Sequence, residues 1–221
     1  MNTFFFGVYP YICLSLFTVG LLFRYLATPG EWNARSSNLF AKKSLAVGSY
    51  IFHYAIIFAF FGHIIGLLIP SQVLAAFGFS ESVHMAVAGF FGKIFAPCVV
   101  VGLAILLWRH FAVPNVLATT VPMDIVVVCF IILQGLTGGC QDFMSSFNVF
   151  DSVGPWIRGV LLWQPQPALM ENVPGYLKAH VICGFAIFAM VPFSRLVHFI
   201  SAPVLWFIRP VIQYRRRYEN L

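Results

Sequence analysis

The sequence predicts an all-α integral membrane protein, a bundle of five transmembrane helices. Hydrophobic residues make up 60% of the 221 residues and charged residues only 9%, and the mean hydropathy is +0.88. A soluble domain carries about 25% charged residues, so this chain has too little charge to cover a water-exposed surface. The second observation is a set of five apolar runs, each close to the roughly 20 residues that a bilayer requires. Together they form one domain, residues 1–221.

Each apolar run is continuous rather than alternating, which favours helices over the strands of a membrane barrel. A helix also satisfies its own backbone groups inside hydrocarbon. The first run has no basic residue before it and no small-residue cleavage site, so we expect a retained span rather than a signal peptide. The predicted spans are residues 4–26, 49–69, 85–108, 124–141 and 179–200.

Basic residues alternate between the two sides of these spans. One side is rich in them and the other holds little beyond Arg158 and Lys178. Cytoplasmic loops carry the excess of lysine and arginine, so the N-terminus is expected outside and the C-terminus in the cytoplasm. The basic residues of the cytoplasmic side are Arg24, Arg35, Lys42, Lys43, Arg109, Arg209, Arg215, Arg216 and Arg217.

The longest loop, residues 142–178, falls on the predicted outer side. Its stretch from Trp156 to Trp163 is apolar and lies between prolines. Tryptophans and apolar residues of this kind favour a short helix lying in the membrane interface over the bundle. An ordinary extracellular loop is the simpler alternative, but few of these residues favour water.

The five cysteines are scattered and form no CxxC pair, so the sequence predicts neither a disulfide framework nor an iron–sulfur site. The net charge of +6 comes from few residues, most of them beside the spans. We therefore expect no nucleic-acid partner.

Four of the six histidines lie in or at the ends of the second and fifth spans: His53, His63, His180 and His198. Ionisable residues inside a membrane are costly and indicate function. Imidazole is a good ligand for iron, and a porphyrin between two helices can take one axial histidine from each. The four therefore predict two haems of the b type, bound non-covalently because the chain has no CxxCH motif. A structural role in helix packing, or a proton relay in a non-redox transporter or anchor, is the alternative.

The two spans run in opposite directions, and this fixes the expected pairs. His53 should face His198 near the cytoplasm, and His63 should face His180 near the outside. The 18 residues from His180 to His198 equal five whole turns, about 27 Å, whereas the 10 residues from His53 to His63 span only about 15 Å. Tilt of the helices or of the haem planes would have to absorb that mismatch.

Small and basic residues lie near these histidines. Gly62, Gly66 and Gly184 would allow close approach of a porphyrin, and helix packing explains them equally well. Arg195, one turn before His198, could pair a haem propionate or a lipid phosphate. His110 is expected to be an interfacial residue, and His84 either a solvated loop residue or a contact for a quinone head group.

Several segments together resemble a known family, the cytochrome b (gamma) subunit of respiratory membrane-bound nitrate reductase. The resemblance covers almost the whole chain and is most specific around the paired histidines. The segments that carry it are FFFGVYPYI, SSNLFAKK, FHYAIIFAFFGHIIGLLIP, ATTVPMDI, VGPWIRGVLLWQPQPALMENVP and PFSRLVHFIS.

The resemblance implies a five-helix membrane anchor with two haems in a prokaryotic cell (inner) membrane. Such a subunit oxidises quinol (menaquinol or ubiquinol) from the quinone pool near the outer face and releases protons there. It passes electrons inward to a cytoplasmic iron–sulfur subunit and on to a molybdenum catalytic subunit. Carried onto this chain, His63 and His180 would hold the outer haem, and His53 and His198 the inner one.

The chain departs from the family at one point. Members often place a lysine near the quinol in the loop between the second and third spans, and the corresponding stretch here, SESVHMA, has none. His84 or Lys93 would take its place, or the quinol would bind differently. No residue touches nitrate, so a homologous subunit serving a sulfite- or heterodisulfide-type reductase or a nitrite oxidoreductase is the near rival.

Overall fold

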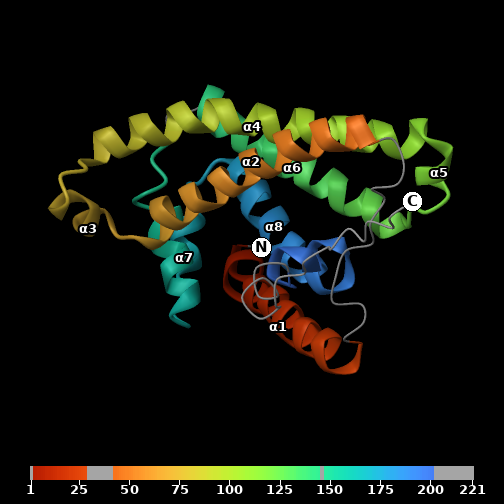
Figure 1. Cartoon of the computed structure of the whole chain (residues 1–221). Helices are drawn as coiled ribbons and strands as arrows, with labels where there is room; N and C mark the ends of the chain where they lie inside the picture. The colour runs from red at the N-terminus through yellow and green to blue at the C-terminus, as the bar shows by residue number, and fades with distance from the viewer. Residues whose placement is uncertain (1, 29–41, 145–146, 202–221) are drawn as a thin grey trace, which may run out of the picture.

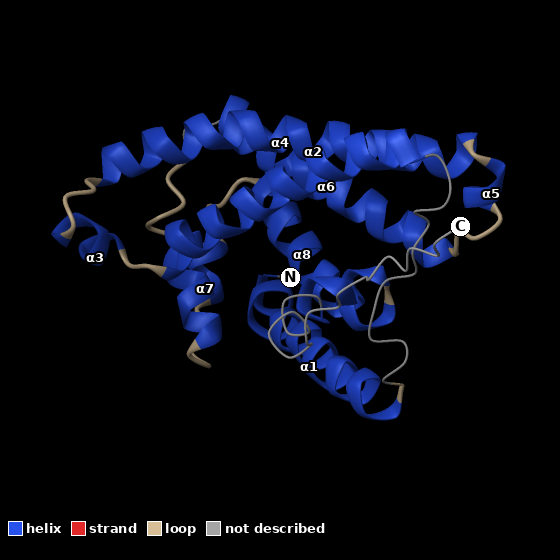
Figure 2. Ribbon diagram, viewed as in Figure 1, coloured by secondary structure: helices blue, strands red, loops and turns tan. Residues whose placement is uncertain are grey.

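A computed structural model describes residues 2–28, 42–144 and 147–201, and every regular element in these ranges is a helix (Figures 1 and 2). The helices in chain order are η1 (Phe4–Val8), α1 (Tyr9–Ala27), α2 (Lys42–His63), η3 (Ile64–Leu68), α3 (Ser71–Ala76), α4 (Glu81–Ala112), α5 (Pro114–Leu117), α6 (Pro122–Met144), α7 (Val153–Leu161), η4 (Pro167–Met170), α8 (Gly175–Met190), η5 (Val191–Phe193) and η6 (Arg195–Val197). Here η1 and η3 are π-helical, and η4, η5 and η6 are 3₁₀ helices.

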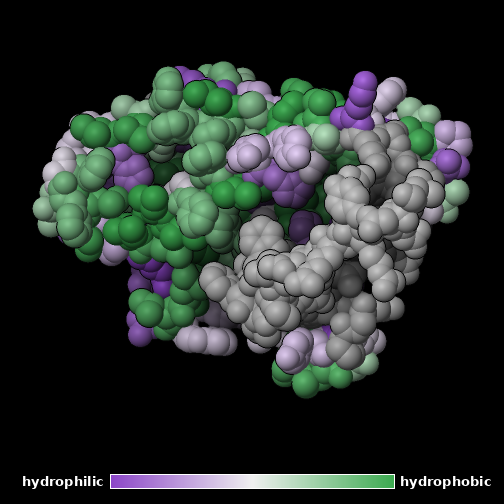
Figure 3. Space-filling model, in the orientation of Figure 1, coloured by the Kyte–Doolittle hydropathy of each residue, from purple (hydrophilic) through white to green (hydrophobic). Residues whose placement is uncertain are grey.

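Five helical stretches are long and apolar enough to cross a membrane: Phe4–Ala27, Lys43–Leu68, Glu81–Ala112, Pro122–Met144 and Gly175–Phe193. Each overlaps one predicted span. Only 11–22% of the most apolar window of each stretch is buried inside the protein, so most apolar side chains face outward, as lipid requires. Figure 3 shows apolar residues spread over much of the described surface on one face.

Neighbouring spans pack in the order α2, α4, α6, α8 and α1. One core joins α2, α4 and α6 through residues such as Ala55, Leu103 and Val127. Small residues bring α2 and α4 close together, because a Cβ at Gly102 would lie 2.7 Å from the Phe52 nitrogen. The helices α2 and α8 are not a packed pair, and this separation matters for the histidines they carry.

A second core joins α1, α7, η4 and α8. The expected short helix in the loop 142–178 is present as α7, and its Trp156 is 1% exposed and donates its indole N–H to the Phe6 carbonyl at 2.9 Å. Arg158 donates to the Leu67 carbonyl at 2.8 Å. These bonds tie α7 to the outer ends of the first and second spans. Its place in a membrane interface stays a prediction.

The fifth predicted span, residues 179–200, was treated as continuous helix, and the structure interrupts it. The helix α8 ends at Met190, and Ser194 is extended between two short 3₁₀ helices. Pro192 causes the break, since proline has no N–H to continue the helix. Arg24 of α1 donates to the carbonyls of Pro192 at 2.6 Å and Ser194 at 3.2 Å. Arg24, one of the basic residues used to predict the orientation of the chain, therefore also stabilises the break in the fifth span.

Arg35 and the basic residues 209–217 lie outside the described residues. The orientation of the N-terminus outside and the C-terminus in the cytoplasm therefore stays a prediction. "Outer" and "inner" below refer to that predicted orientation.

Replacing Trp156 by Phe should destabilise the protein. The change removes the indole N–H that donates to the Phe6 carbonyl, and a hydrogen bond of this kind contributes about 0.5–1.5 kcal/mol. We expect a lower thermal unfolding temperature in detergent. Trp108→Phe is the matched control, because Trp108 is 62% exposed. Equal unfolding temperatures for the two variants would contradict the role given to the Trp156 bond.

Candidate functional site: two histidine pairs

The structure brings the four membrane histidines together in the pairs that the topology predicted. The rings of His53 and His198 have centroids 6.0 Å apart with planes at 59°. The rings of His63 and His180 have centroids 5.9 Å apart with planes at 13°. Each pair joins the second span to the fifth, although α2 and α8 do not pack against each other. The imidazoles therefore meet across a space between helices.

All four imidazoles use the same ring nitrogen for hydrogen bonding. Each Nδ1 lies within hydrogen-bond distance of a backbone carbonyl, which can only accept, so Nδ1 carries the proton. In a neutral ring Nε2 then keeps its lone pair, and within the described residues no hydrogen bond reaches any of the four Nε2 atoms. The carbonyls are Ser49 for His53 (2.8 Å), Ala59 for His63 (2.6 Å), Gln134 for His180 (3.1 Å) and Arg195 for His198 (2.6 Å).

This arrangement fits axial ligation of a haem iron. Imidazole nitrogen binds a metal at about 2 Å, so two nitrogens on opposite sides of one iron lie about 4 Å apart, with ring centroids about 6 Å apart. The observed 6.0 and 5.9 Å agree. The described residues contain no group of three or more metal-ligating side chains. The donor set therefore suits a group that brings its own equatorial ligands.

The glycines near the pairs divide into two kinds. A Cβ at Gly62 would meet nothing within 4 Å, and this glycine is exposed on the helix surface. A Cβ at Gly66 would lie 3.4 Å from His84, and one at Gly184 would lie 3.3 Å from the Gln134 amide, so these two glycines accommodate protein side chains. Sequence reasoning missed Gly138 of α6, whose Cβ would lie 3.1 Å from the His180 ring; only its place in a pair of glycines could have pointed to it.

Arg195 forms a bidentate ion pair with Asp124, which sequence reasoning also missed. Its Nε donates to Oδ1 at 2.8 Å and its Nη2 to Oδ2 at 2.6 Å. Asp124 is 5% exposed, in the first turn of α6. Because the Arg195 carbonyl accepts from His198, this ion pair connects α6 to the histidine beyond the break. Asp124 uses neither hydrogen of Nη1, which keeps its capacity for a further anion such as a propionate.

The end of α4 is buried within the protein. His110 is 6% exposed, with its Nδ1 2.6 Å from the Thr120 hydroxyl, and its predicted place at the membrane interface stays a prediction. Arg109 is also buried (2% exposed). His110 lies within electrostatic range of Arg195 and Asp124, and Arg109 within range of Arg195. Packing of the α4–α6 connection over the helix end removes these side chains from the surface, and a polar cluster forms near the inner pair.

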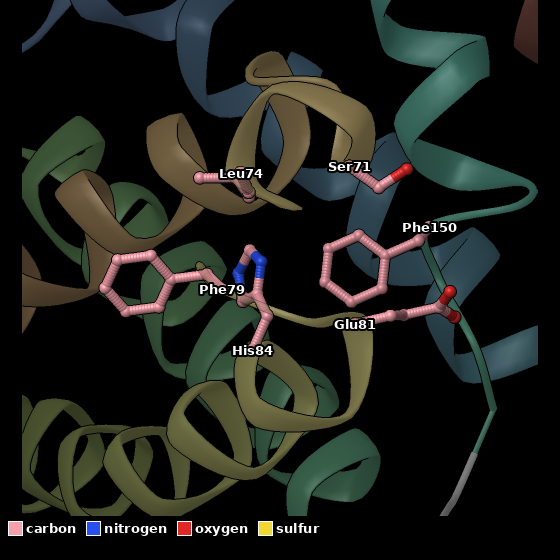
Figure 4. Close-up of a pocket in the computed structure, with 6 residues that line it drawn as sticks. All are labelled: Ser71, Leu74, Phe79, Glu81, His84 and Phe150. Atoms are coloured by element: carbon pink, nitrogen blue, oxygen red, sulfur yellow. The ribbon is translucent and has the colours of Figure 1, made fainter. Parts of the chain in front are cut away.

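The two residues suggested for quinol, His84 and Lys93, do not come together. His84 packs against Phe150 (centroids 4.6 Å) in a pocket also lined by Ser71 and Glu81 (Figure 4). The pocket volume of about 10 Å³ has room for one water molecule and not for a quinone ring.

Lys93 lies nine residues further along α4 and therefore on the opposite face. It is exposed and lies within electrostatic range of Asp142, which packs against Gly92 and is also in range of His63. Of the two candidates, Lys93 is thus the one that shares an acidic neighbour with the outer pair.

Comparison with known proteins gives consistent results. The model of a family described as nitrate reductase gamma subunit matches residues 2–217. The nitrate reductase gamma chain of Bacillus subtilis is 36% identical over 217 residues, 96% of each chain. The respiratory nitrate reductase 2 gamma chain of Escherichia coli is 31% identical over 224 residues, 98% of each chain. The nitrate reductase-like protein NarX of Mycobacterium tuberculosis is 36% identical over 225 residues, 99% of this chain and 34% of that protein.

Replacing Asp124 by Asn should destabilise the inner end of the site. The change leaves the Arg195 guanidinium without its carboxylate. Breaking a buried pair costs about 3–5 kcal/mol, and the 31% exposure of the Arg195 side chain puts the loss at the lower end. The thermal unfolding temperature in detergent should fall clearly. Glu171→Gln, which removes the same charge from an exposed residue, should leave it nearly unchanged; an equal effect of both variants would show that the Asp124 pair contributes little.

Proposed function

This chain belongs to the nitrate reductase gamma subunit family, and we propose that it is the dihaem cytochrome b subunit that oxidises quinol for nitrate reduction. It is a multi-pass membrane protein and the electron-transfer subunit of a nitrate reductase complex. The observation that carries the finer proposal is a pair of imidazoles with centroids 6.0 or 5.9 Å apart at each of two levels, with each Nδ1 on a carbonyl and no hydrogen bond to Nε2 from the described residues.

Two non-covalent haems b would be held by these pairs. His63 and His180 would hold the outer one, and His53 and His198 would hold the inner one. Bound haem supplies a one-electron carrier at each level. Arg195, already oriented by Asp124, would offer Nη1 to a propionate of the inner haem.

Quinol, either menaquinol or ubiquinol, would be oxidised near the outer pair. Oxidation of one quinol releases two protons and two electrons. The protons leave on the outer side while the electrons move inward, and each charge separated stores about 2.3 kcal/mol per 100 mV. The structure favours Lys93 over His84 as a side chain near the quinol, since the space around His84 is too small for a quinone ring.

The partners would lie on the cytoplasmic side of a prokaryotic cell membrane. An iron–sulfur subunit receives the electrons and a molybdenum catalytic subunit reduces nitrate. Arg109, His110 and Asp124 are buried near the inner pair, and Arg195 forms its ion pair with Asp124 there. Nitrate chemistry itself belongs to the partner.

The haem content of histidine variants tests this proposal. A pyridine haemochrome assay of the purified chain should give two haems b per chain. His63→Ala or His180→Ala should remove one haem, and His53→Ala or His198→Ala the other. His84→Ala is the matched control, because His84 belongs to neither pair, and it should keep both. A wild-type chain without haem would contradict the redox proposal and favour a role of the histidines in helix packing or proton relay.

The order of electron transfer gives a second test. His63→Ala should stop quinol oxidation in the complex, since the first acceptor is lost. His53→Ala should still allow rapid reduction of the remaining haem by quinol but block nitrate reduction. Stopped-flow spectra of the haem bands distinguish the two variants. Full-rate quinol oxidation by His63→Ala, or rapid onward transfer in His53→Ala, would show that the series order is wrong.

A further inference from the structure

The helix α6 contributes none of the four histidines, yet it surrounds one of them. The Nδ1 of His180 lies 3.1 Å from the Gln134 carbonyl and 3.1 Å from the Thr137 hydroxyl oxygen. One turn along the same helix, Gly138 faces the His180 ring at 3.1 Å from its Cβ position. The His180 ring therefore contacts three residues of α6, namely Gln134, Thr137 and Gly138.

His180 differs in this respect from the other three. His53, His63 and His198 donate to carbonyls three or four residues earlier in their own segments. Their orientation is therefore set locally. His180 takes both of its partners from a helix more than forty residues away in sequence, so the orientation of this ring depends on α6.

The hydroxyl of Thr137 has its hydrogen committed elsewhere. It donates to the Leu133 carbonyl at 2.8 Å. A hydroxyl has one hydrogen and two lone pairs, so its oxygen accepts from the Nδ1–H of His180. Gln134 and Thr137 thus share one proton of the ring, and together they fix its tautomer and its plane.

We propose that Thr137 is a positioning residue that holds His180 and sets the reduction potential of the outer haem. The inference rests on the proposed function. A hydrogen bond accepted from the far nitrogen of a ligating imidazole raises its basicity. A more basic axial ligand stabilises the oxidised iron, which lowers the potential. The same contact keeps the His180 plane within 13° of the His63 plane.

The experiment is a redox titration of the purified chain with both haems bound. Thr137→Val keeps the shape of the side chain and removes one of the two acceptors of the His180 Nδ1–H, leaving the Gln134 carbonyl as the other. The reduction potential of one haem should rise and its low-spin electron paramagnetic resonance signal should shift. The potential and the signal of the other haem should stay unchanged. The haem that responds is identified as the outer one by its absence in His63→Ala.

Two further variants complete the test. Thr137→Ser restores the hydroxyl and should restore potential and signal. Thr18→Val removes a threonine hydroxyl from α1, which carries neither pair, and should change nothing. If Thr137→Val binds two haems with both potentials unchanged, or if both potentials move equally, the inference is wrong while the proposed function stands. A wild-type chain without haem overturns the proposed function instead.

Discussion

The protein depends on one constraint, that an imidazole inside a membrane has to use both of its ring nitrogens. Here a carbonyl takes the Nδ1–H of each of the four membrane histidines. The lone pair on each Nε2 is then left without a hydrogen-bond donor among the described residues, in rings whose centroids lie 6.0 and 5.9 Å apart in pairs. A positive centre between the rings of a pair would give both lone pairs a partner, and the haem iron of the proposed function would have the required charge and spacing. The packing of the helices is consistent with this, since α2 and α8 each pack on other helices and leave the space between them to the imidazoles.

The same constraint accounts for the break in the fifth span. In α2 the interval between His53 and His63 is helical throughout and spans about 15 Å. Eighteen residues of straight helix would overshoot that depth, so the fifth span could not present both of its histidines to the second. The interruption at Pro192 and Ser194 shortens the path. Its exposed carbonyls would be costly in an apolar setting, and Arg24 satisfies two of them. Beyond the break, Asp124 holds Arg195 and with it the carbonyl that orients His198.

The spans and the histidine pairs could be predicted because both depend on order along the chain. Apolar runs and antiparallel neighbours are sufficient to place His53 opposite His198. What could not be predicted depends on contacts between helices. Asp124 looks like an ordinary first-turn acid in sequence, and His110 like an interfacial residue; only the fold buries them beside Arg195. Pro192 can be seen in the sequence, but the contacts of Arg24 and Asp124 that stabilise a broken helix cannot.

The two histidine pairs differ in ring geometry and in what holds the rings, and this difference bears on the direction of the proposed electron transfer. The outer rings are nearly parallel (13°), with one of them held by α6, whereas the inner rings are strongly rotated (59°) and both are held locally. The orientation of axial imidazoles and the hydrogen bonds to them are among the means by which a protein tunes haem iron. Two carriers in identical surroundings would have equal potentials and would give electrons no preferred direction. On the inner level His198 also lies within electrostatic range of Arg195, which is paired with Asp124. Under the proposed function the two haems would therefore have unequal surroundings, which a directed transfer of electrons requires.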